Sequence, residues 1–245
     1  SIVAIFSGTK VEPIIEQLMK ISNKKRDMVK EITLDMANSM KTIAKKCFPK
    51  AVQVTDRFHV QKLALEALQD IRIKHRWDAI DQENEHIKRA KEKNRTFVPK
   101  EFSNGDTRKQ LLARSRYLLY KSPNNWTPNQ SERSRILFSQ YPDIKLAFEL
   151  VQGLRHIFNT ATTIQVAYTK LAHWYKDVEN TGFRAFNTIA NTISLNYRSI
   201  LNYFINRSTN ASAESFNAKI KAFRTQFRGV RNTEFFLFRL TQLFA

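Results

Sequence analysis

The stretch that decides the fold is VKEITLDMANSMKTIAKKCFPKAVQVTDRFHVQK, residues 29–62. It opens with a strand-like run over 29–34, rich in apolar and β-branched residues, which stops at Asp35. Apolar residues then recur at spacings of three and four over 37–46, the pattern of an amphipathic helix. The stretch therefore begins as a strand followed by a helix.

A second strand follows that helix. Pro49 cannot continue a helix, and the apolar run over 51–55 stops at Asp56. A strand–helix–strand unit within one sheet is parallel and crosses over right-handed. Asp35 and Asp56 then lie at the carboxyl ends of their strands, the edge at which open α/β sheets bind ligands.

Each aspartate has two interpretations. Aspartate is common at helix N-caps, so either residue alone could serve only as a cap. Asp56, however, is followed by Arg57, Phe58 and His59, which gather a cation and a titratable imidazole beside the acid. Two aspartates at matching strand ends, one of them followed by a cation and an imidazole, favour a role in catalysis or binding.

Two groups of motifs carry a family resemblance. The first is Leu34-Asp35-Met36-Ala37, then Phe48-Pro49-x-Ala51, then Asp56-Arg57-Phe58-His59-Val60. The second is Asn210-Ala-Ser-Ala-Glu214-Ser-Phe-Asn217-Ala-Lys219-Ile-Lys221, then Arg228-Gly229-Val-Arg231-Asn232 and Phe236-x-x-Arg239-Leu240. In order and spacing, the chain resembles the DDE-type transposases of bacterial insertion sequences. Their Mutator-like and hAT-like relatives share an Asp/Cys-x-x-His motif after the second catalytic aspartate.

The resemblance implies an α/β fold, an RNase H-like catalytic core interrupted by a large all-helical insertion and predominantly helical overall. In such a core a three-stranded meander precedes the first helix. Residues 2–6 then match its third strand and residues 12–21 the first helix, so Asp35 takes the second catalytic place. The strand with the first aspartate is missing from this order, and we expect an N-terminally truncated product.

A rival assignment makes Asp35 and Asp56 the first and second carboxylates. We disfavour it because the family motif Asp-x-x-His follows the second aspartate rather than containing it. On the preferred assignment Asp56 has a supporting role.

The chain is expected to have three parts. Residues 1–60 form the partial core, residues 61–206 the helical insertion, and residues 207–245 the C-terminal helices that complete the core with Glu214. In and around the insertion, helices are expected over about 60–94, 108–120, 131–140, 143–158, 162–179, 183–193 and 195–206. Trp126 lies in the polar break over 122–130, where packing as a local anchor is favoured over stacking on a base.

The last functional helix is expected from an Asn210 N-cap to about Phe227, before Gly229, with a closing helix over 234–244. An acid at position 214 suits the helix dipole, which is a purely structural explanation for it. A carboxylate at the head of a cationic helix also suits a metal ion beside a DNA phosphate. The predicted DNA-binding residues are Lys219, Lys221, Arg224, Arg228 and Arg231.

Charge is the strongest compositional signal. The chain of 245 residues has 41 Lys and Arg against 22 Asp and Glu, a net charge of +19. Such a field attracts polyanions and favours a nucleic-acid partner, although a generically basic surface or binding to an acidic membrane has the same composition. Scarce glycine and 18 phenylalanines predict a folded, helical protein rather than an all-β one.

Cys47 is the single cysteine, which excludes a disulfide within this chain and a cysteine-based zinc site. It lies on the apolar stripe of its helix and is predicted to be buried. No apolar run approaches the roughly 20 residues that span a bilayer, and no signal peptide is visible.

The resemblance implies Mg²⁺-dependent (or Mn²⁺-dependent) DNA cleavage and strand transfer in transposition. Asp35 and Glu214 are the predicted catalytic and metal-binding residues, and the supporting residues are Asp56, His59, Arg57 and Asn217. The implied partners are double-stranded transposon ends and target DNA, and other copies of the full-length chain, in the bacterial cytoplasm at the nucleoid. Two alternatives stay open: a non-catalytic basic nucleic-acid-binding protein, and, less favoured, a ribonuclease of the same sheet architecture.

Overall fold

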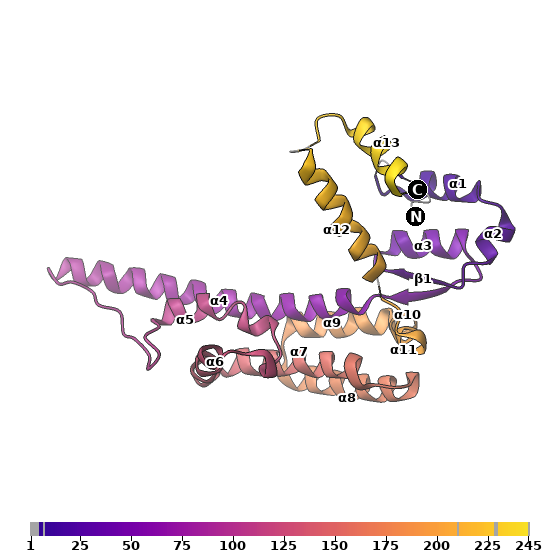
Figure 1. Ribbon diagram of the computed structural model, residues 1–245. Helices are drawn as coiled ribbons and strands as arrows, with labels where there is room; N and C mark the ends of the chain where they lie inside the picture. The colour runs from indigo at the N-terminus through magenta and orange to yellow at the C-terminus, as the bar shows by residue number, and fades with distance from the viewer. Residues whose placement is uncertain (1–4, 7, 210, 228–229, 245) are drawn as a thin grey trace. The chain divides into compact units, whose positions relative to one another are not determined.

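The computed structural model describes residues 5–6, 8–209, 211–227 and 230–244. The chain forms two compact units, the first made of residues 1–59 with 196–245 and the second of residues 60–195. Both units are mainly helical (Figure 1), as the sequence predicts, and none of the described helices is long and apolar enough to cross a membrane.

The sheet of the first unit has two parallel strands, β1 (Glu31–Leu34) and β2 (Val52–Thr55). They pair in register from Glu31 opposite Val52 to Leu34 opposite Thr55, and α3 (Asn38–Cys47) connects them. The predicted strand–helix–strand unit is confirmed, with the two strands two residues and one residue shorter than expected.

A small apolar core holds α3 against α1 (Val11–Met19). Ile14, Ile43 and Cys47 are buried in it, because the apolar residues of both helices recur on one face. The short helix α2 (Asn23–Asp27) is fixed to the end of α3 by the buried Arg26, whose Nη1 donates to the carbonyl of Cys47 over 2.6 Å. Ile14 and Ile43 of this core line the same cavity as Asp35.

The predicted strand over residues 2–6 falls largely outside the described residues. Ile5 and Phe6 are described and belong to no strand, while Phe6 packs against the α1–α3 core. The predicted first helix is confirmed by α1, which ends two residues early.

The expected helix over 195–206 is wrong in two respects. It is divided into α10 (Tyr197–Leu201) and α11 (Tyr203–Asn206), and both belong to the sheet-bearing unit rather than to the helical one. The break follows from hydrogen bonds to β2: the amide of Asn202 donates to the carbonyl of Gln53 over 2.9 Å, and Thr55 donates to the hydroxyl of Ser199 over 2.8 Å. The side chains of Ser199 in α10 and of Asn202, which follows α10, thus fasten this segment to the sheet.

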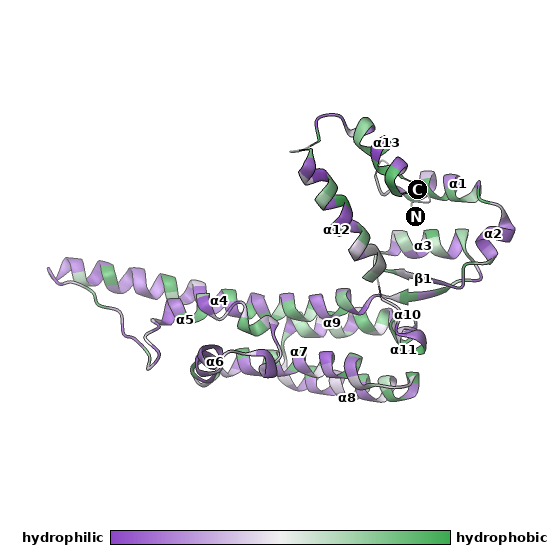
Figure 2. Ribbon diagram, viewed as in Figure 1, coloured by the Kyte–Doolittle hydropathy of each residue, from purple (hydrophilic) through white to green (hydrophobic). Residues whose placement is uncertain are grey.

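Two helices close the first unit, α12 (Ala211–Gln226) and α13 (Thr233–Phe244). Aromatic rings join them: Phe216 packs edge-on against Phe244, and Phe223 stacks on Phe236 with centroids 5.5 Å apart. Polar and apolar residues alternate along both helices (Figure 2), so each carries an apolar stripe and a charged face.

The second unit consists mainly of helices, with an isolated antiparallel bridge between Glu101 and Thr107 in the segment that follows its first helix. Its longest element is α4 (Arg57–Glu92), which begins in the first unit and belongs mostly to the second. The remaining elements are α5 (Arg108–Arg114), two 3₁₀ turns (Leu118–Tyr120 and Pro123–Asn125), α6 (Pro128–Gln140), α7 (Pro142–Thr160), α8 (Ile164–Thr181) and α9 (Arg184–Leu195). The predicted helix over 108–120 is therefore an α-helix and a separate turn.

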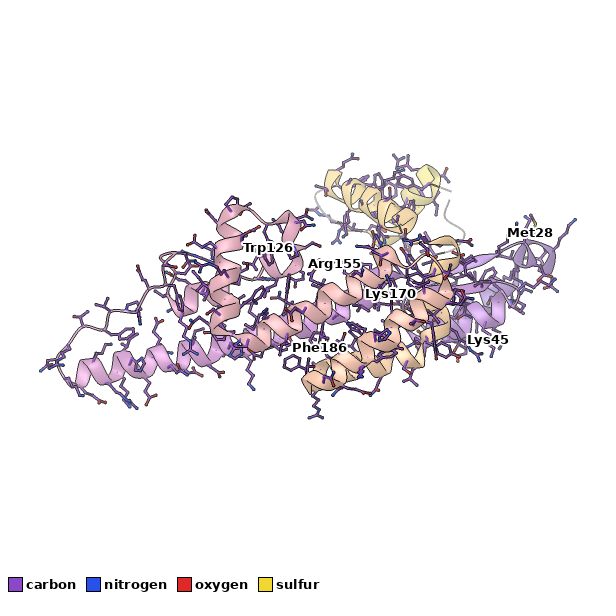
Figure 3. All side chains as sticks on the ribbon, turned by 90° about the horizontal axis from the view of Figure 1, so that it is seen from below. Met28, Lys45, Trp126, Arg155, Lys170 and Phe186 are labelled. Carbon is purple, nitrogen blue, oxygen red and sulfur yellow. The ribbon has the colours of Figure 1, made fainter. Side chains whose placement is uncertain are left out.

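Trp126 anchors the turn between α5 and α6, as predicted. Its ring stacks on Phe148 with centroids 5.5 Å apart, and its Nε1 donates to the carbonyl of Leu118 over 2.8 Å. Arg155 of α7 holds the same segment, since its Nη2 donates to the carbonyl of Tyr120 over 2.9 Å (Figure 3). The segment over 122–130, which the sequence shows as a polar break, is thus a well-packed turn between helices.

Candidate active site

Asp35 follows the last residue of β1, and its side chain begins the turn into α3. Its Oδ1 accepts a hydrogen bond from the backbone N–H of Ala37 over 2.9 Å, while Oδ2 has no hydrogen-bond partner among the described residues. The side chain is half-buried. The carboxylate therefore caps the chain with one oxygen and leaves the other for a ligand.

Asp56 occupies the matching position after β2. Its backbone N–H donates to the carbonyl of Leu34 over 3.1 Å, so the two aspartates are neighbours at one edge of the sheet. Its Oδ1 accepts from the backbone N–H of Phe58 over 3.1 Å at the start of α4, and the residue is only 2% exposed. The geometry thus realises the capping interpretation at Asp56. Asp35 instead closes a turn before α3, whose N-cap is Ala37, and Asp35 is the more accessible of the two aspartates.

A cleft of about 590 Å³ adjoins Asp35 in the first unit. Asp35 and His59 contribute its ionisable groups, and α1, β1 and α3 provide apolar walls that include Leu18, Ile32 and Met40. The structure therefore brings two predicted site residues, far apart on the β-α-β unit, to one concave surface.

Lys41 of α3 lies within electrostatic reach of Asp35. Burial lowers the pKa of its ammonium group, and the charge of Asp35 opposes that change. Its Nζ also donates to the side-chain oxygen of Asn196. The edge near Asp35 thus contains a cation held between a carboxylate and an amide.

Arg57 and His59 occupy the first turn of α4. The Arg57 guanidinium lies 6.0 Å from the ring centre of Tyr203 in α11, a cation–π arrangement. The His59 ring meets Phe58 edge-on with centroids 5.8 Å apart, and Phe58 is 55% exposed. Both supporting residues are held beside the sheet edge that carries the aspartates.

Glu214 lies in the first turn of α12, as predicted, and is exposed. Asn217, Lys219, Lys221 and Arg224 are exposed along the same helix, and Arg231 is exposed just before α13. Arg228 lies outside the described residues. α12 thus presents a charged face, but no described contact joins Glu214 to Asp35.

The donor chemistry of the candidate site fits a hard divalent cation, because Mg²⁺ prefers carboxylate oxygens. In the chain as described, however, no group of three or more His, Cys, Asp or Glu side chains is arranged to hold a metal ion. The shared metal site of Asp35 and Glu214 stays a prediction.

Lys41, Asn196, Ser199 and Asn202 are contributors that the sequence interpretation did not single out. The last three recur at a spacing of three in an otherwise apolar segment, a pattern that places polar groups on one face of a helix. That spacing could have indicated a helix docked on polar backbone at a sheet edge. Nothing in the sequence around Lys41 indicates its proximity to Asn196, 155 residues away.

Comparisons with known proteins agree with the motifs. A family model described as a transposase, that of the ISL3-type DDE transposases, matches residues 1–240. Two curated relatives from Mycobacterium tuberculosis, of strains CDC 1551 / Oshkosh and ATCC 25618 / H37Rv, are each named as the transposase for insertion sequence element IS1557. Each is 29% identical to this chain over 135 residues, which is 54% of this chain and 29% of the relative.

No solved structure matches the chain significantly. The family assignment therefore rests on sequence, and the family model extends over almost all of that sequence, from the β-α-β unit to the C-terminal helices. This chain belongs to the ISL3 family of DDE transposases.

Proposed function

We propose that this chain is the catalytic part of a transposase that cuts DNA at transposon ends and joins the new 3′ ends to target DNA in a Mg²⁺-dependent reaction. Asp35 and Glu214 are two of its metal-binding carboxylates. The observation that supports this best is the Asp35 side chain, which lies beside a cleft with Oδ2 free of protein hydrogen bonds. A carboxylate that served only as a cap would not need that cleft.

The third acid of the set is expected on a strand that precedes residue 1. Among the described residues β1 pairs only with β2, so the opposite edge of β1 offers unpaired backbone groups to another strand. A strand added there would carry its own carboxyl-terminal residues beside Asp35 if it ran parallel to β1. The RNase H-like architecture of the whole core is part of this proposal.

The metal would supply Lewis-acid stabilisation of the charge that develops at phosphorus. The protein's own residues would orient the DNA. His59 lines the Asp35 cleft, and Arg57, two residues earlier, packs against Tyr203. Both would position the turn after β2 or contact the flanking strand, while Asp56 holds the start of α4. The exposed cations of α12 and Arg231, with Asn217, would contact the DNA backbone.

The test compares two proteins on a labelled duplex that contains a transposon end. The chain of residues 1–245 is expected to bind the duplex without nicking it, and the same chain extended upstream through the acid-bearing strand is expected to nick it with Mg²⁺. In the extended protein, Asp35→Asn should lower the nicking rate by about a thousandfold or more, because several kcal/mol of transition-state stabilisation are lost. Asparagine keeps the cap to Ala37, so the fold should survive.

Glu149→Gln is a matched control, because Glu149 is an exposed acid of α7 in the second unit. It should leave nicking unchanged. Nicking that persists in the Asp35→Asn protein would contradict the assignment of Asp35, and nicking by residues 1–245 alone would favour the rival pair Asp35 and Asp56.

A non-catalytic DNA-binding protein is the second candidate, because each aspartate accepts a hydrogen bond from a backbone N–H two residues later, which is a purely structural role. It predicts that Asp35→Asn combined with Glu214→Gln leaves Mg²⁺ affinity unchanged in a calorimetric titration. A clear loss of affinity in the double variant would exclude it.

A further inference from the structure

In the second unit α5 lies beside α4 (Figure 1), and three arginines gather where α5 ends against α4. Arg72 and Arg76 are one helical turn apart on α4, and Arg116 follows α5. Two hydrogen bonds fix the juxtaposition: Arg72 Nη1 donates to the carbonyl of Leu112 over 2.9 Å, and Gln69 donates to the carbonyl of Arg116 over 3.3 Å.

The three arginines differ in how their donors are used. Arg72 is 5% exposed and its Nε also donates to Gln69 over 2.7 Å, so it has a structural role at the end of α5. Arg76 is different, because its Nε is buried without a hydrogen-bond partner. Arg116 is exposed, and its guanidinium lies 5.4 Å from the ring centre of Tyr117, which holds it at the surface.

No carboxylate compensates this cluster. None of the three arginines forms an ion pair with a residue in the described part of the chain. Burial, and then the charges of Arg76 and Arg116, lower the pKa of the Arg72 guanidinium, which is the signature of like charges close together. Like charges held together with no carboxylate among the described residues to pair with them are a site at which an anion would be stabilised.

We propose that Arg76 and Arg116 bind a backbone phosphate of duplex DNA, on a surface of the helical unit separate from the Asp35 cleft. Guanidinium groups match phosphate oxygens in shape and charge. A phosphate at the guanidinium groups of Arg76 and Arg116 would screen the repulsion among the three cations. That the phosphate belongs to DNA rests on the proposed function. That a phosphate binds here rests on the cluster of three arginines.

The test is fluorescence anisotropy with a labelled transposon-end duplex, titrated with the residue 1–245 protein between 0.05 and 0.3 M salt. Arg76→Gln is expected to weaken binding roughly eightfold at 0.1 M salt and to reduce the slope of log K against log salt by about 0.9, the loss of one phosphate contact. Arg116→Gln should have the same effect on the affinity and on the salt dependence. The Arg116 side chain is exposed, so this variant serves as the test if Arg76→Gln proves unstable.

Arg184→Gln is the matched control, because Arg184 is an exposed arginine at the start of α9. It removes the same charge and should leave the slope unchanged. Wild-type protein that binds DNA, with Arg76→Gln and Arg116→Gln indistinguishable from Arg184→Gln, would overturn the inference alone. Wild-type protein that does not bind the duplex would instead count against the proposed function as well.

Discussion

Asp35 in the first unit and Asp106 in the second are used in opposite ways. Asp35 is half-buried beside a cleft, makes one hydrogen bond to backbone and has a free oxygen. Asp106 is 0% exposed and is enclosed by Arg114 and Arg133, the latter at 2.7 Å, with Asn104 donating to it over 2.9 Å. A carboxylate that the protein has saturated can only hold structure, whereas one that it has left unsaturated can hold a ligand.

Among the carboxylates, the largest effect on stability is therefore expected at Asp106. Asp106→Asn should lower the free energy of unfolding of the second unit by about 3 kcal/mol, because it leaves two arginines without their buried partner. Urea denaturation followed by circular dichroism measures this. Glu132→Gln, an exposed acid of α6, should change stability by less than about 0.5 kcal/mol.

The pH dependence checks the same carboxylate independently. Burial alone would raise the pKa of Asp106, but the hydrogen bonds from Arg133, Arg114 and Asn104 outweigh it and lower that pKa. Its stabilisation is then complete above the unfolded value of about 3.9 and is lost as the pH falls through the lower folded value. The stability difference between wild type and Asp106→Asn should narrow only below about pH 4, and a difference that narrows near pH 6 would contradict this account.

The contrast between these two aspartates also separates what the sequence could predict from what it could not. The β-α-β unit and Asp35 were predictable, because hydrophobic period, Pro49 and strand-end aspartates are local signals. Asp106 follows Gly105 and precedes the helix expected over 108–120, in a segment for which the sequence predicted no helix. Its partners Arg114 and Arg133 are 8 and 27 residues away, so only packing of α5 against α6 identifies them.

The same distinction explains the segment over 195–206. Its apolar period resembles that of the preceding insertion helices, which is why the sequence assigned it to them. Hydrogen bonds from Asn202 to Gln53 and from Lys41 to Asn196 span 149 and 155 residues, and such long-range pairing has no local signature. The meeting of Asp35 with Glu214 depends on contacts of the same long-range kind and stays a prediction.

An intermediate effect is expected at Asp56, which tests whether a buried strand-end aspartate resembles Asp35 or Asp106. Asp56→Ala should cost about 1 kcal/mol, because it removes the cap that accepts from Phe58. Asp56→Asn retains that acceptor and should leave stability within about 0.5 kcal/mol of wild type. Nicking by the upstream-extended protein should also survive Asp56→Asn, and its loss would give Asp56 a catalytic place.

The smallest effect is expected at Cys47, whose thiol reports on the first unit alone, since this is the single cysteine of the chain. The thiol is 0% exposed between α1 and α3, and burial raises its pKa against the charges of Arg26 and Lys46. The reactive thiolate is therefore suppressed, and labelling with a disulfide reagent at pH 8 should require opening of the α1–α3 core.

Because Asp106, Arg114 and Arg133 all belong to the second unit, Asp106→Asn should change the labelling rate of Cys47 by less than about twofold at low urea. Ile14→Ala, which opens the core around the thiol, should accelerate labelling more than tenfold, since such a truncation costs about 2–5 kcal/mol. Labelling accelerated as strongly by Asp106→Asn as by Ile14→Ala would mean that α4, which runs from one unit into the other, makes their unfolding a single cooperative event.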